Sequence, residues 1–391
     1  MVKSLSLIFK KIYNEAPDVL SFAPGRVNII GEHTDYNQGY VLPAALNLRI
    51  YFLASRRQDD EVFIWAENFK KKDTFSLNNI SFSQRNKWAN YVKGIFWILM
   101  EEGLTPGGMN GIIWGDIPLE AGLSSSAALE VSVIQGLNTL FRLGLAPKKM
   151  AELAQKAEND FVGVKCGLMD QFISVFGQKN KAMFLDCESL EYELIPLQLE
   201  KAELRIVVFE SGVRRKLASS EYNKRRIESA CALEFLKKMG AKSYKQATLN
   251  ILKDRKKKMG EVLFKRARHV ISENGRVKEA VEALKENDFR FLGELLFRSH
   301  ESLRDDYEVS CPELNLFYDT ARKFSGCVGA RLTGAGFGGS GIALVEKERV
   351  DAFRKKLLEE ASERGFVRPK VYEVEVGKGA ESCYLNREEK G

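Results

Sequence analysis

The sequence predicts an α+β protein of two domains, residues 1–199 and 200–391, with a cleft between them. Length and composition give the first reason: 391 residues, 45% of them apolar, suffice for two domains at roughly 100–200 residues each. The second reason is a shift near residue 200, where mixed strand and helix patterns give way to mostly helical ones.

Individual strands and helices follow from the spacing of apolar residues. Continuous or alternating apolar runs predict strands at 40–54, 61–66, 111–116, 181–187, 191–196 and 204–209. Helical spacing predicts helices at 88–103, from Ser124–Ser126 onward, at 148–162, over much of 217–304 and at 312–324. The segment GARLTGAGFGGSGIALV, residues 329–345, predicts a glycine-rich strand–turn–strand.

The stretch APGRVNIIGEHTDYNQGY, residues 23–40, predicts a loop. Glycine, asparagine and charged residues are too frequent in it for a buried strand. Arg26 can form bidentate bonds to an oxyanion or a carboxylate, while Glu32, His33 and Asp35 supply the mixed donors and acceptors that read sugar hydroxyls. The bland alternative is a surface turn with capping Asp and Asn residues.

Charge and hydropathy argue against nucleic-acid and membrane functions. The net charge is +7, but the densest basic run, KDRKKKMG at 253–260, has no aromatic residue for base stacking. We interpret it as a solvated loop or helix end. No apolar run reaches the 18 or more residues of a membrane span, and the charged start does not resemble a secretory signal. We therefore expect a cytoplasmic protein.

Cysteine and histidine usage gives no metal or disulfide signature. The six cysteines are scattered without a C-x-x-C pair, and the three histidines include no i, i+4 pair. We expect reduced, mostly buried thiols and no histidine-rich transition-metal site.

Two further loops could bind a ligand. GLSSSAA, residues 122–128, places a glycine, three hydroxyls and helix-start N–H groups together, which suits a phosphate. A simple serine N-cap is the alternative, because both the Walker and the dinucleotide-binding glycine patterns are absent. LTGAGFGGSG, residues 332–341, has five glycines in eight positions, which indicates close backbone packing or a tight hairpin.

In this order and separation, the three loops resemble those of the GHMP small-molecule kinases, and the first resembles the signature of the galactokinase branch. The resemblance runs from about residue 20 to 345, so it is far more specific than a single glycine loop. It is carried by APGRVNIIGEHTDYNQGYVLPAAL, WANYVKG (88–94), AENDFVGVKCGLMDQF (157–172), LASSEYNKRR (217–226), RARHVISEN (266–274) and SHESLRDDYEVSCPEL (299–314).

The resemblance implies a fold, an activity and site residues. The fold is the two-domain GHMP kinase fold with the active site in the interdomain cleft. The activity is ATP-dependent phosphorylation of the C1 hydroxyl of α-D-galactose by a monomer that uses Mg²⁺. Asp170 matches the catalytic base, and Arg26 matches its partner, which would hold the carboxylate ionised. Sugar contacts are implied for Glu32, His33, Thr34, Asp35, Gly167 and Tyr222. ATP contacts are implied for Trp88, Glu120, Ala121, Gly122, Leu123, Ser124, Ser125 and Ser126, and magnesium ligands for Ser126 and Glu158.

Two departures and three alternatives accompany this interpretation. Glu120 stands where the family usually has glycine, and Ser340 where it often has cysteine. Trp88 lies on an apolar helical stripe, so a core position suits it as well as adenine contact. The chain could instead phosphorylate a related sugar such as N-acetylgalactosamine, galacturonate or arabinose, or sense galactose and ATP without catalysis. The complete set of Ser124–Ser126, Glu158 and Asp170 argues for an enzyme.

Overall fold

The computed structural model describes residues 1–118, 121–213, 218–253 and 255–385, with the backbone alone at 218–220. Helices and strands are mixed throughout, as the α+β prediction requires. The helices are α1 (Val2–Tyr13), α2 (Ala89–Glu101), α3 (Ser125–Phe141), α4 (Pro147–Lys156), α5 (Met169–Phe176), α6 (Ala218–Lys237), α7 (Leu249–Leu252), α8 (Lys256–Met259), α9 (Glu261–Glu286), α10 (Phe289–Asp305), α11 (Pro312–Lys323) and α12 (Val350–Glu363), with short 3₁₀ turns η1 (Asp35–Asn37) and η3 (Lys347–Arg349) and one π-helical turn, η2 (Ala157–Val162).

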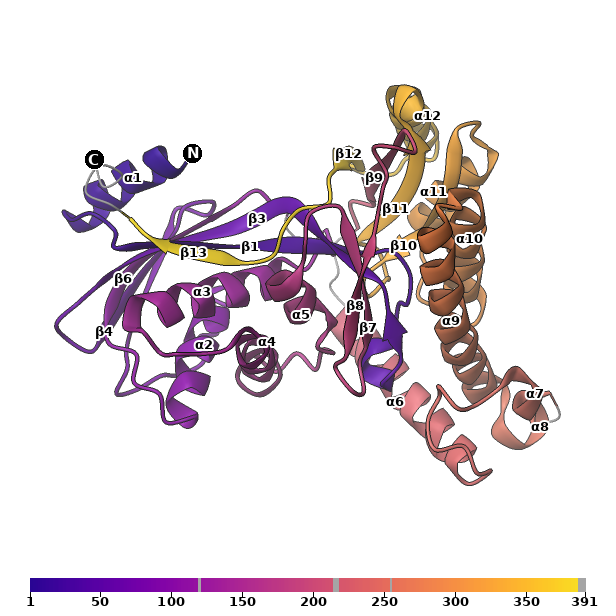
Figure 1. Cartoon of the computed structure of the whole chain (residues 1–391), viewed down its shortest axis with the longest axis horizontal. Coiled ribbons are helices and arrows are strands. Elements are labelled where there is room, and N and C mark those ends of the chain that lie inside the picture. The colour runs from indigo at the N-terminus through magenta and orange to yellow at the C-terminus, as the bar shows by residue number, and fades with distance from the viewer. Residues whose placement is uncertain (119–120, 214–217, 254, 386–391) are drawn as a thin grey trace.

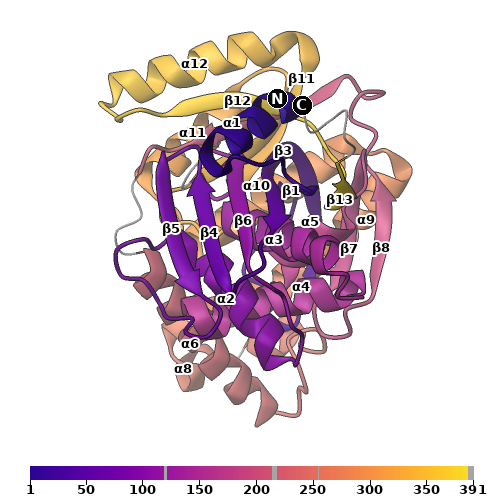
Figure 2. The same ribbon diagram turned by 90° about the vertical axis from the view of Figure 1, so that its left-hand side faces the viewer.

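The first sheet has six strands in the order β13-β1-β3-β6-β4-β5. Helices α2 to α5 lie on one side of it and α1 on the other (Figure 1), and Figure 2 shows β5, β4 and β6 side by side. Its strands are β1 (Val19–Asn28), β3 (Pro43–Arg56), β4 (Glu61–Ala66), β5 (Lys71–Ser76), β6 (Met109–Gly115) and β13 (Glu381–Tyr384).

Two smaller sheets complete the fold. The four-stranded sheet runs β10-β11-β9-β12 and packs against α10, α11 and α12, and the three-stranded sheet runs β2-β7-β8. Their strands are β2 (Tyr40–Val41), β7 (Lys181–Asp186), β8 (Tyr192–Pro196), β9 (Leu204–Glu210), β10 (Cys327–Thr333), β11 (Ser340–Glu346) and β12 (Lys370–Val374).

The predicted strands and helices are confirmed, but the start of the 23–40 stretch is not a loop. Residues 23–28 belong to β1, where all six are buried. The strand accommodates its polar residues because distant segments supply partners: the Arg26 N–H donates to the Leu123 carbonyl at 3.0 Å, and the Asn28 N–H donates to the Thr333 hydroxyl at 3.2 Å. The prediction of a loop was wrong there because these partners are about 100 and 300 residues away in the sequence.

The C-terminal segment returns to the first sheet. Strand β13 pairs antiparallel with β1, and Val376 forms an isolated bridge with Leu46. The largest hydrophobic cluster also contains residues from both sides of position 200, among them Ile134 and Leu292. A division at 199/200 remains a prediction, and any such division must leave β13 with the first sheet.

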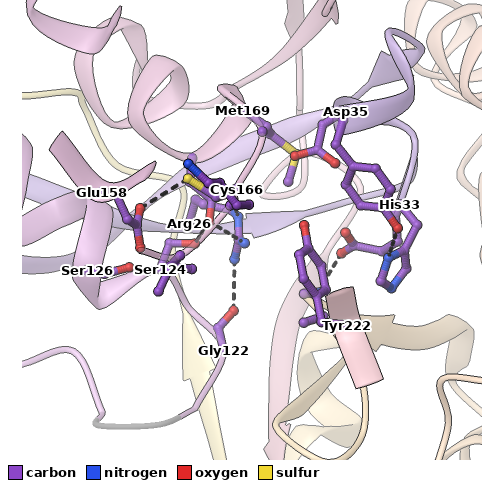
Figure 3. A pocket seen from close by; sticks show the side chains of 18 of the residues that line it. Arg26, His33, Asp35, Gly122, Ser124, Ser126, Glu158, Cys166, Met169 and Tyr222 are labelled. Carbon is purple, nitrogen blue, oxygen red and sulfur yellow. Dashed lines mark hydrogen bonds and ion pairs between the residues drawn. The ribbon is translucent and has the colours of Figure 1, made fainter. Parts of the chain in front are cut away.

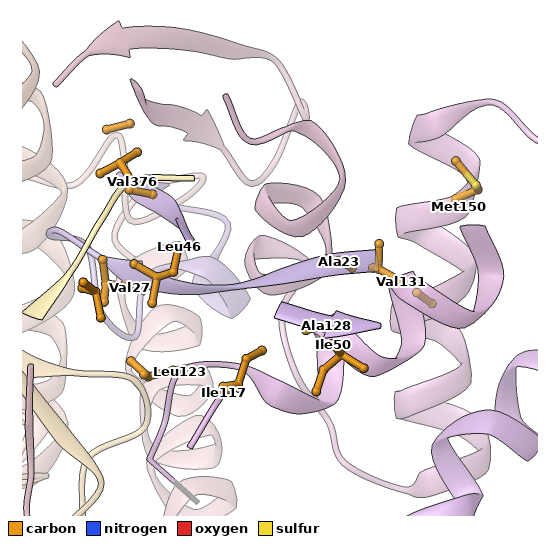
Figure 4. Packing of buried hydrophobic residues seen from close by; sticks show 14 of the residues in the cluster. Ala23, Val27, Leu46, Ile50, Ile117, Leu123, Ala128, Val131, Met150 and Val376 are labelled. Atoms are coloured by element: carbon orange, nitrogen blue, oxygen red, sulfur yellow. The ribbon is translucent and has the colours of Figure 1, made fainter. Parts of the chain in front are cut away.

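The hydrophobic core lies between the first sheet and its helices and extends to the phosphate-binding candidate. Val27, Leu46 and Ile50 of the sheet contribute to the cluster drawn in Figure 4, together with Ile117 and Leu123, which flank the 119–122 segment. Full burial of such side chains stabilises the fold by about 1.5–3 kcal/mol each. The core therefore holds Leu123, just before the start of α3.

The described part of the chain contains no helix that is both long and apolar enough to span a membrane. No disulfide joins any of the six cysteines, all of which lie in the described part of the chain. They are less buried than predicted: Cys231 and Cys383 are exposed, and the other four are half-buried.

Candidate active site

A cavity of about 410 Å³ gathers most of the residues singled out in the sequence. The 26–36 segment, the start of α3, the 163–170 segment, α6 and the turn after β10 all contribute walls to it (Figure 3). Lining residues that the sequence predicted are Arg26, Glu32, His33, Asp35, Gly122, Ser124, Ser125, Ser126, Glu158, Gly167, Asp170 and Tyr222.

At the centre of the cavity, Arg26 and Asp170 form a two-pronged ion pair. Arg26 Nε donates to Asp170 Oδ1 at 2.7 Å, and Nη2 donates to Oδ2 at 2.8 Å. Arg26 Nη1 donates to the Gly122 carbonyl at 2.8 Å, and the Ser124 hydroxyl donates to Asp170 Oδ2. Burial is the largest single influence and would lower the pKa of Arg26, but the nearby carboxylates of Asp170, Glu32 and Asp35 together outweigh it and raise the pKa. Such paired, charge-assisted bonds fix the orientation of the carboxylate.

Asp170 lies in the first turn of α5, but Leu168 is the N-cap residue. The carboxylate of Asp170 is engaged by the side chains of Arg26 and Ser124 rather than by a helix N–H. A purely structural capping role for Asp170 is therefore poorly supported.

The wall that carries Glu32 is held by the C-terminal half of the chain. Glu32 Oε1 accepts from the Thr333 hydroxyl at 3.0 Å and from the Gly334 N–H at 2.7 Å. The Gly31 N–H donates to Glu273 Oε1 at 3.0 Å, and Glu273 also pairs with Arg276 at 2.7 Å. Each of these groups is buried, so the loop has a fixed shape without a ligand.

His33 adds a strained backbone to the same wall. Its φ is 62°, a left-handed conformation that is uncommon outside glycine. His33 Nδ1 shares a hydrogen bond of 2.8 Å with the Tyr36 hydroxyl, and that hydroxyl lies 3.0 Å from the Tyr307 hydroxyl. Burial, together with nearby His269, lowers the pKa of His33 to about 3, so the ring is neutral at physiological pH.

Asp35 and Gly167 fit each other closely. A Cβ atom on Gly167 would lie 2.0 Å from Asp35 Oδ2, so only glycine leaves room for this carboxylate. Burial, with the charge of Asp170, raises the pKa of Asp35 to about 7. Tyr222 on α6 packs beside the same wall, with its ring centroid 5.5 Å from that of Tyr36 and 5.8 Å from that of His33.

The start of α3 has the geometry of an anion site. Ser124 occupies the N-cap position in a left-handed conformation, φ 58°, and makes no side-chain cap bond. Since its hydroxyl is directed to Asp170, it leaves the first helical N–H groups to another partner. Gly334 lies against Gly122: a Cβ atom added to Gly334 would be 3.1 Å from the Gly122 carbonyl oxygen. The two glycine-rich loops thus meet beside the anion site.

Glu158 and Ser126 form the acidic side of the cavity. Glu158 is 5% exposed, and its carboxylate interacts with the Ser126 hydroxyl. Burial raises the pKa of Glu158 to about 7, and burial also raises the pKa of neighbouring Glu130 well above its usual value. Within the described residues, no set of three or more His, Cys, Asp or Glu side chains could hold a metal ion.

Comparison with known proteins gives a consistent assignment. A model of the galactokinase galactose-binding signature matches residues 8–56, and the GHMP kinase N-terminal and C-terminal models match 90–178 and 280–363. Galactokinase of Pyrococcus furiosus is 45% identical over 86% of this chain and 92% of its own length. That of Staphylococcus carnosus is 41% identical over 97% and 98%. The chain belongs to the galactokinase family.

Its activity is therefore that of a sugar kinase, a galactokinase with ATP as the phosphoryl donor. The crystal structure of Lactococcus lactis galactokinase complexed with galactose superposes with a TM-score of 0.93, at 39% identity, covering 97% of this chain and 99% of that one. Methanococcus jannaschii mevalonate kinase shares the fold, with a TM-score of 0.65 at 20% identity over 92% and 98%. These matches confirm the predicted GHMP kinase fold.

Four residues that the galactokinase resemblance implied do not line the cavity. Thr34 is buried and donates to the Gly31 carbonyl at 2.7 Å. Ala121 and Leu123 are buried behind the phosphate-loop candidate, and Trp88 packs against the main hydrophobic cluster. Glu120 lies outside the described residues.

Other lining residues were not assigned a role from the sequence. The list comprises Tyr36, Gly163, Val164, Lys165, Cys166, Met169, Asn223, Gly334 and Ala335. Tyr36, Cys166 and Gly334 lie inside motifs quoted from the sequence, so proximity to an assigned residue was an available signal. Asn223, next to Tyr222 on α6, had the same signal.

Proposed function

We propose that this cavity transfers the γ-phosphoryl group of ATP to the C1 hydroxyl of α-D-galactose, giving α-D-galactose 1-phosphate and ADP, with Asp170 as the base. The observation that carries the proposal is the Arg26–Asp170 pair. It lies between the start of α3 and the cavity wall formed by residues 28–34, which we call the sugar-loop wall. A carboxylate held by a cation beside an anion site suits phosphoryl transfer to a hydroxyl.

The sugar occupies the side of the cavity lined by Glu32, His33 and Asp35, where Tyr222 packs beside His33. Carboxylate oxygens there accept hydrogen bonds from sugar hydroxyls, and the aromatic side chains exclude water. Gly167 contributes indirectly, because it leaves space for Asp35. Thr34, which does not line the cavity, holds the loop by donating to the Gly31 carbonyl.

The phosphates occupy the start of α3, where Gly122 and Ser124–Ser126 offer N–H groups and hydroxyls. Ser126 and Glu158 fit a magnesium ion for two reasons. Both supply oxygen ligands, and burial without a paired cation raises the pKa of the Glu158 carboxyl, so a metal ion there would stabilise its charged form. When bound, Mg²⁺ would neutralise phosphate charge there.

In the transfer step, the C1 oxygen attacks the γ-phosphorus, and the bond between that phosphorus and the ADP oxygen breaks. The hydroxyl proton passes to Asp170, and Arg26 stabilises charge on the transferring group. Positioning supplies most of the acceleration in such reactions, so the fixed geometry of the Arg26–Asp170 pair is central to the proposal.

The assay that tests this function measures ADP release on a panel of sugars with purified protein, and identifies the phosphorylated position by NMR. We expect efficient turnover of galactose and a product phosphorylated at C1. Turnover confined to N-acetylgalactosamine, galacturonate or arabinose would contradict the substrate, and binding of galactose and ATP without ADP release would contradict catalysis.

We also propose a cytoplasmic monomer. The cysteines of the described chain form no disulfide, which is typical of a reducing compartment. Fractionation and sedimentation of the native protein test these two points, and a disulfide-linked or secreted form would contradict them.

A further inference from the structure

The cavity wall behind Glu158 contains a buried polar group that the proposed mechanism does not use. Gln171, next to Asp170 on α5, is fully buried, and so is Glu130, one turn after Ser126 on α3. Buried amides and carboxylates are costly unless they are hydrogen-bonded, so their arrangement calls for an explanation.

A single amide nitrogen joins two carboxylates. Gln171 Nε2 donates to Glu158 Oε2 at 2.7 Å and to Glu130 Oε2 at 3.1 Å. Glu130 Oε1 and Gln171 Oε1 have no hydrogen-bond partner among the described residues. The two N–H bonds of one side chain thus tie η2, α3 and α5 together at this point.

The Cys166 thiol acts on the same oxygen of Glu158. Its Sγ lies 3.3 Å from Glu158 Oε2, and the dashed line in Figure 3 marks this contact. In the same view the other carboxylate oxygen of Glu158 points toward Ser126. Two donors therefore engage one oxygen, while the second faces the side of the cavity where the metal ligands are proposed.

We propose that Gln171 and Cys166 are positioning residues that make Glu158 a one-oxygen ligand and thereby select Mg²⁺ over Ca²⁺. This inference rests on the proposed role of Glu158 as a magnesium ligand. Ca²⁺ often takes both oxygens of a carboxylate and tolerates irregular geometry, whereas Mg²⁺ requires a near-octahedral arrangement and keeps several waters. Because Oε2 already accepts hydrogen bonds, binding of Ca²⁺ through both carboxylate oxygens is disfavoured. Binding of Mg²⁺ through the other oxygen alone is unaffected.

Glu130 has a supporting part in this arrangement. It accepts the second N–H bond of Gln171 and so prevents rotation of the amide away from Glu158. Residues behind metal ligands commonly change metal affinity by about 10–100-fold when they are altered. We expect the largest change in the ratio of the two metal affinities rather than in the affinity for either ion alone.

The test is calorimetric binding of ADP in the presence of Mg²⁺ or Ca²⁺ to the wild-type protein and to Gln171→Met combined with Cys166→Ala. Methionine keeps the volume of glutamine but removes the amide donor. We expect the Mg²⁺-to-Ca²⁺ preference to fall by about tenfold or more. Gln135→Met is the matched control. The Gln135 amide also donates a partly buried hydrogen bond, to the Ser382 hydroxyl at 2.8 Å, but it does so away from the cavity.

A preference within twofold of wild type in a folded double variant would overturn the inference. If the double variant does not fold, Gln171→Asn and Cys166→Ala are measured singly, and an unchanged preference in both has the same meaning. Glu158→Gln separates this inference from the proposed function. Unchanged Mg²⁺–ADP affinity in that variant contradicts the metal role of Glu158 itself, whereas weakened affinity with an unchanged Gln171 effect contradicts only the positioning role.

Discussion

The two walls of the cavity differ in how far the protein itself satisfies their charges. In the sugar-loop wall, Glu32 accepts two hydrogen bonds from the segment after β10, and Glu273 pairs with Arg276 while holding the Gly31 N–H. The opposite case is the part of the site formed by Glu158, Glu130 and the start of α3, which we call the nucleotide wall. Glu158 and Glu130 have raised pKa values because they are buried, and Glu130 Oε1 has no partner within the described residues.

This difference distinguishes a site that is complete before its ligand arrives from one that a cation completes. A neutral sugar brings no charge, so the protein alone balances Glu32 and Glu273. Asp35, beside this wall, is the exception, because burial and the charge of Asp170 raise its pKa to about 7. A nucleotide arrives with a metal ion, so the nucleotide wall can keep an excess of carboxylate that the metal neutralises. Arg26 and Asp170 stand where the two walls meet.

The largest effect is expected from Asp170→Asn, at the junction of the walls. The amide keeps the shape of the side chain but cannot accept the C1 hydroxyl proton. We expect kcat to fall by about 10²–10⁴-fold while galactose and ATP still bind. Steady-state kinetics and calorimetric binding measure this. Turnover within a few-fold of wild type would mean that Asp170 is not the base and that the proton passes to the phosphate.

The next largest effect tests whether the buried Glu273–Arg276 pair fixes the sugar-loop wall. Glu273→Gln removes a fully buried charge that faces Arg276, and breaking one partner of a buried pair costs about 3–5 kcal/mol. We expect that loss in urea unfolding, with a rise of about tenfold in the KM for galactose. The glutamine amide keeps an oxygen that can accept from the Gly31 N–H, but its NH2 group cannot pair with Arg276, so that acceptor is no longer held in place.

Glu294→Gln is the control for this variant, since Glu294 pairs with Arg322 on the surface and such pairs contribute about 0–1 kcal/mol. The two substitutions make the same chemical change at opposite extremes of burial. Equal losses of stability in both variants would show that the buried pair does not lock the wall.

Arg26→Lys should have a smaller effect on the junction. Lysine keeps the positive charge but loses the planar fork that bonds both oxygens of Asp170. We expect kcat to fall by about 10–100-fold, with galactose affinity nearly unchanged. Single-turnover measurements follow the chemical step, and an unchanged rate would remove Arg26 from the mechanism.

The smallest predicted effect concerns pH and Asp35. Burial raises its pKa from 3.8 to about 7 in the folded protein, so the unfolded chain releases the proton first as pH rises. The contribution of Asp35 to stability is therefore fully present below about pH 4 and is lost between about pH 4 and 7. We expect Asp35→Asn to flatten the fall in Tm across this range. A parallel fall in both proteins would contradict the raised pKa.

Local periodicity predicted much of the fold. The strand at 61–66 and the helix near 89–101 show their apolar spacing directly, and both are confirmed. Strand β1 was missed at residues 23–28 because Arg26 and Asn28 are buried with partners at positions 123 and 333, and no local pattern reports such contacts. The return of β13 to β1 depends on pairing across the whole chain and was likewise invisible.

The site residues were predicted from motifs, so a residue whose role depends on contacts between distant segments was missed. Asp170 and Glu158 were available from family resemblance, but Gln171 lies within the same motif and looks like an ordinary helical residue. Its importance appears only when η2, α3 and α5 come together and one amide bridges two carboxylates. Thr34 is the reverse case: its place within a motif suggested sugar contact, which remains a prediction, whereas its hydroxyl donates to the Gly31 carbonyl.

The central claim is that the sugar-loop wall is complete without ligand and the nucleotide wall is completed by a cation. Hydrogen–deuterium exchange tests it directly when residues 28–34 and 158–171 are followed in the free protein, with galactose, and with ADP and Mg²⁺. We predict that 28–34 is protected in the free protein and changes little with galactose, whereas 158–171 gains protection only with ADP and Mg²⁺. Rapid exchange of 28–34 in the free protein, slowed by galactose alone, would contradict the account.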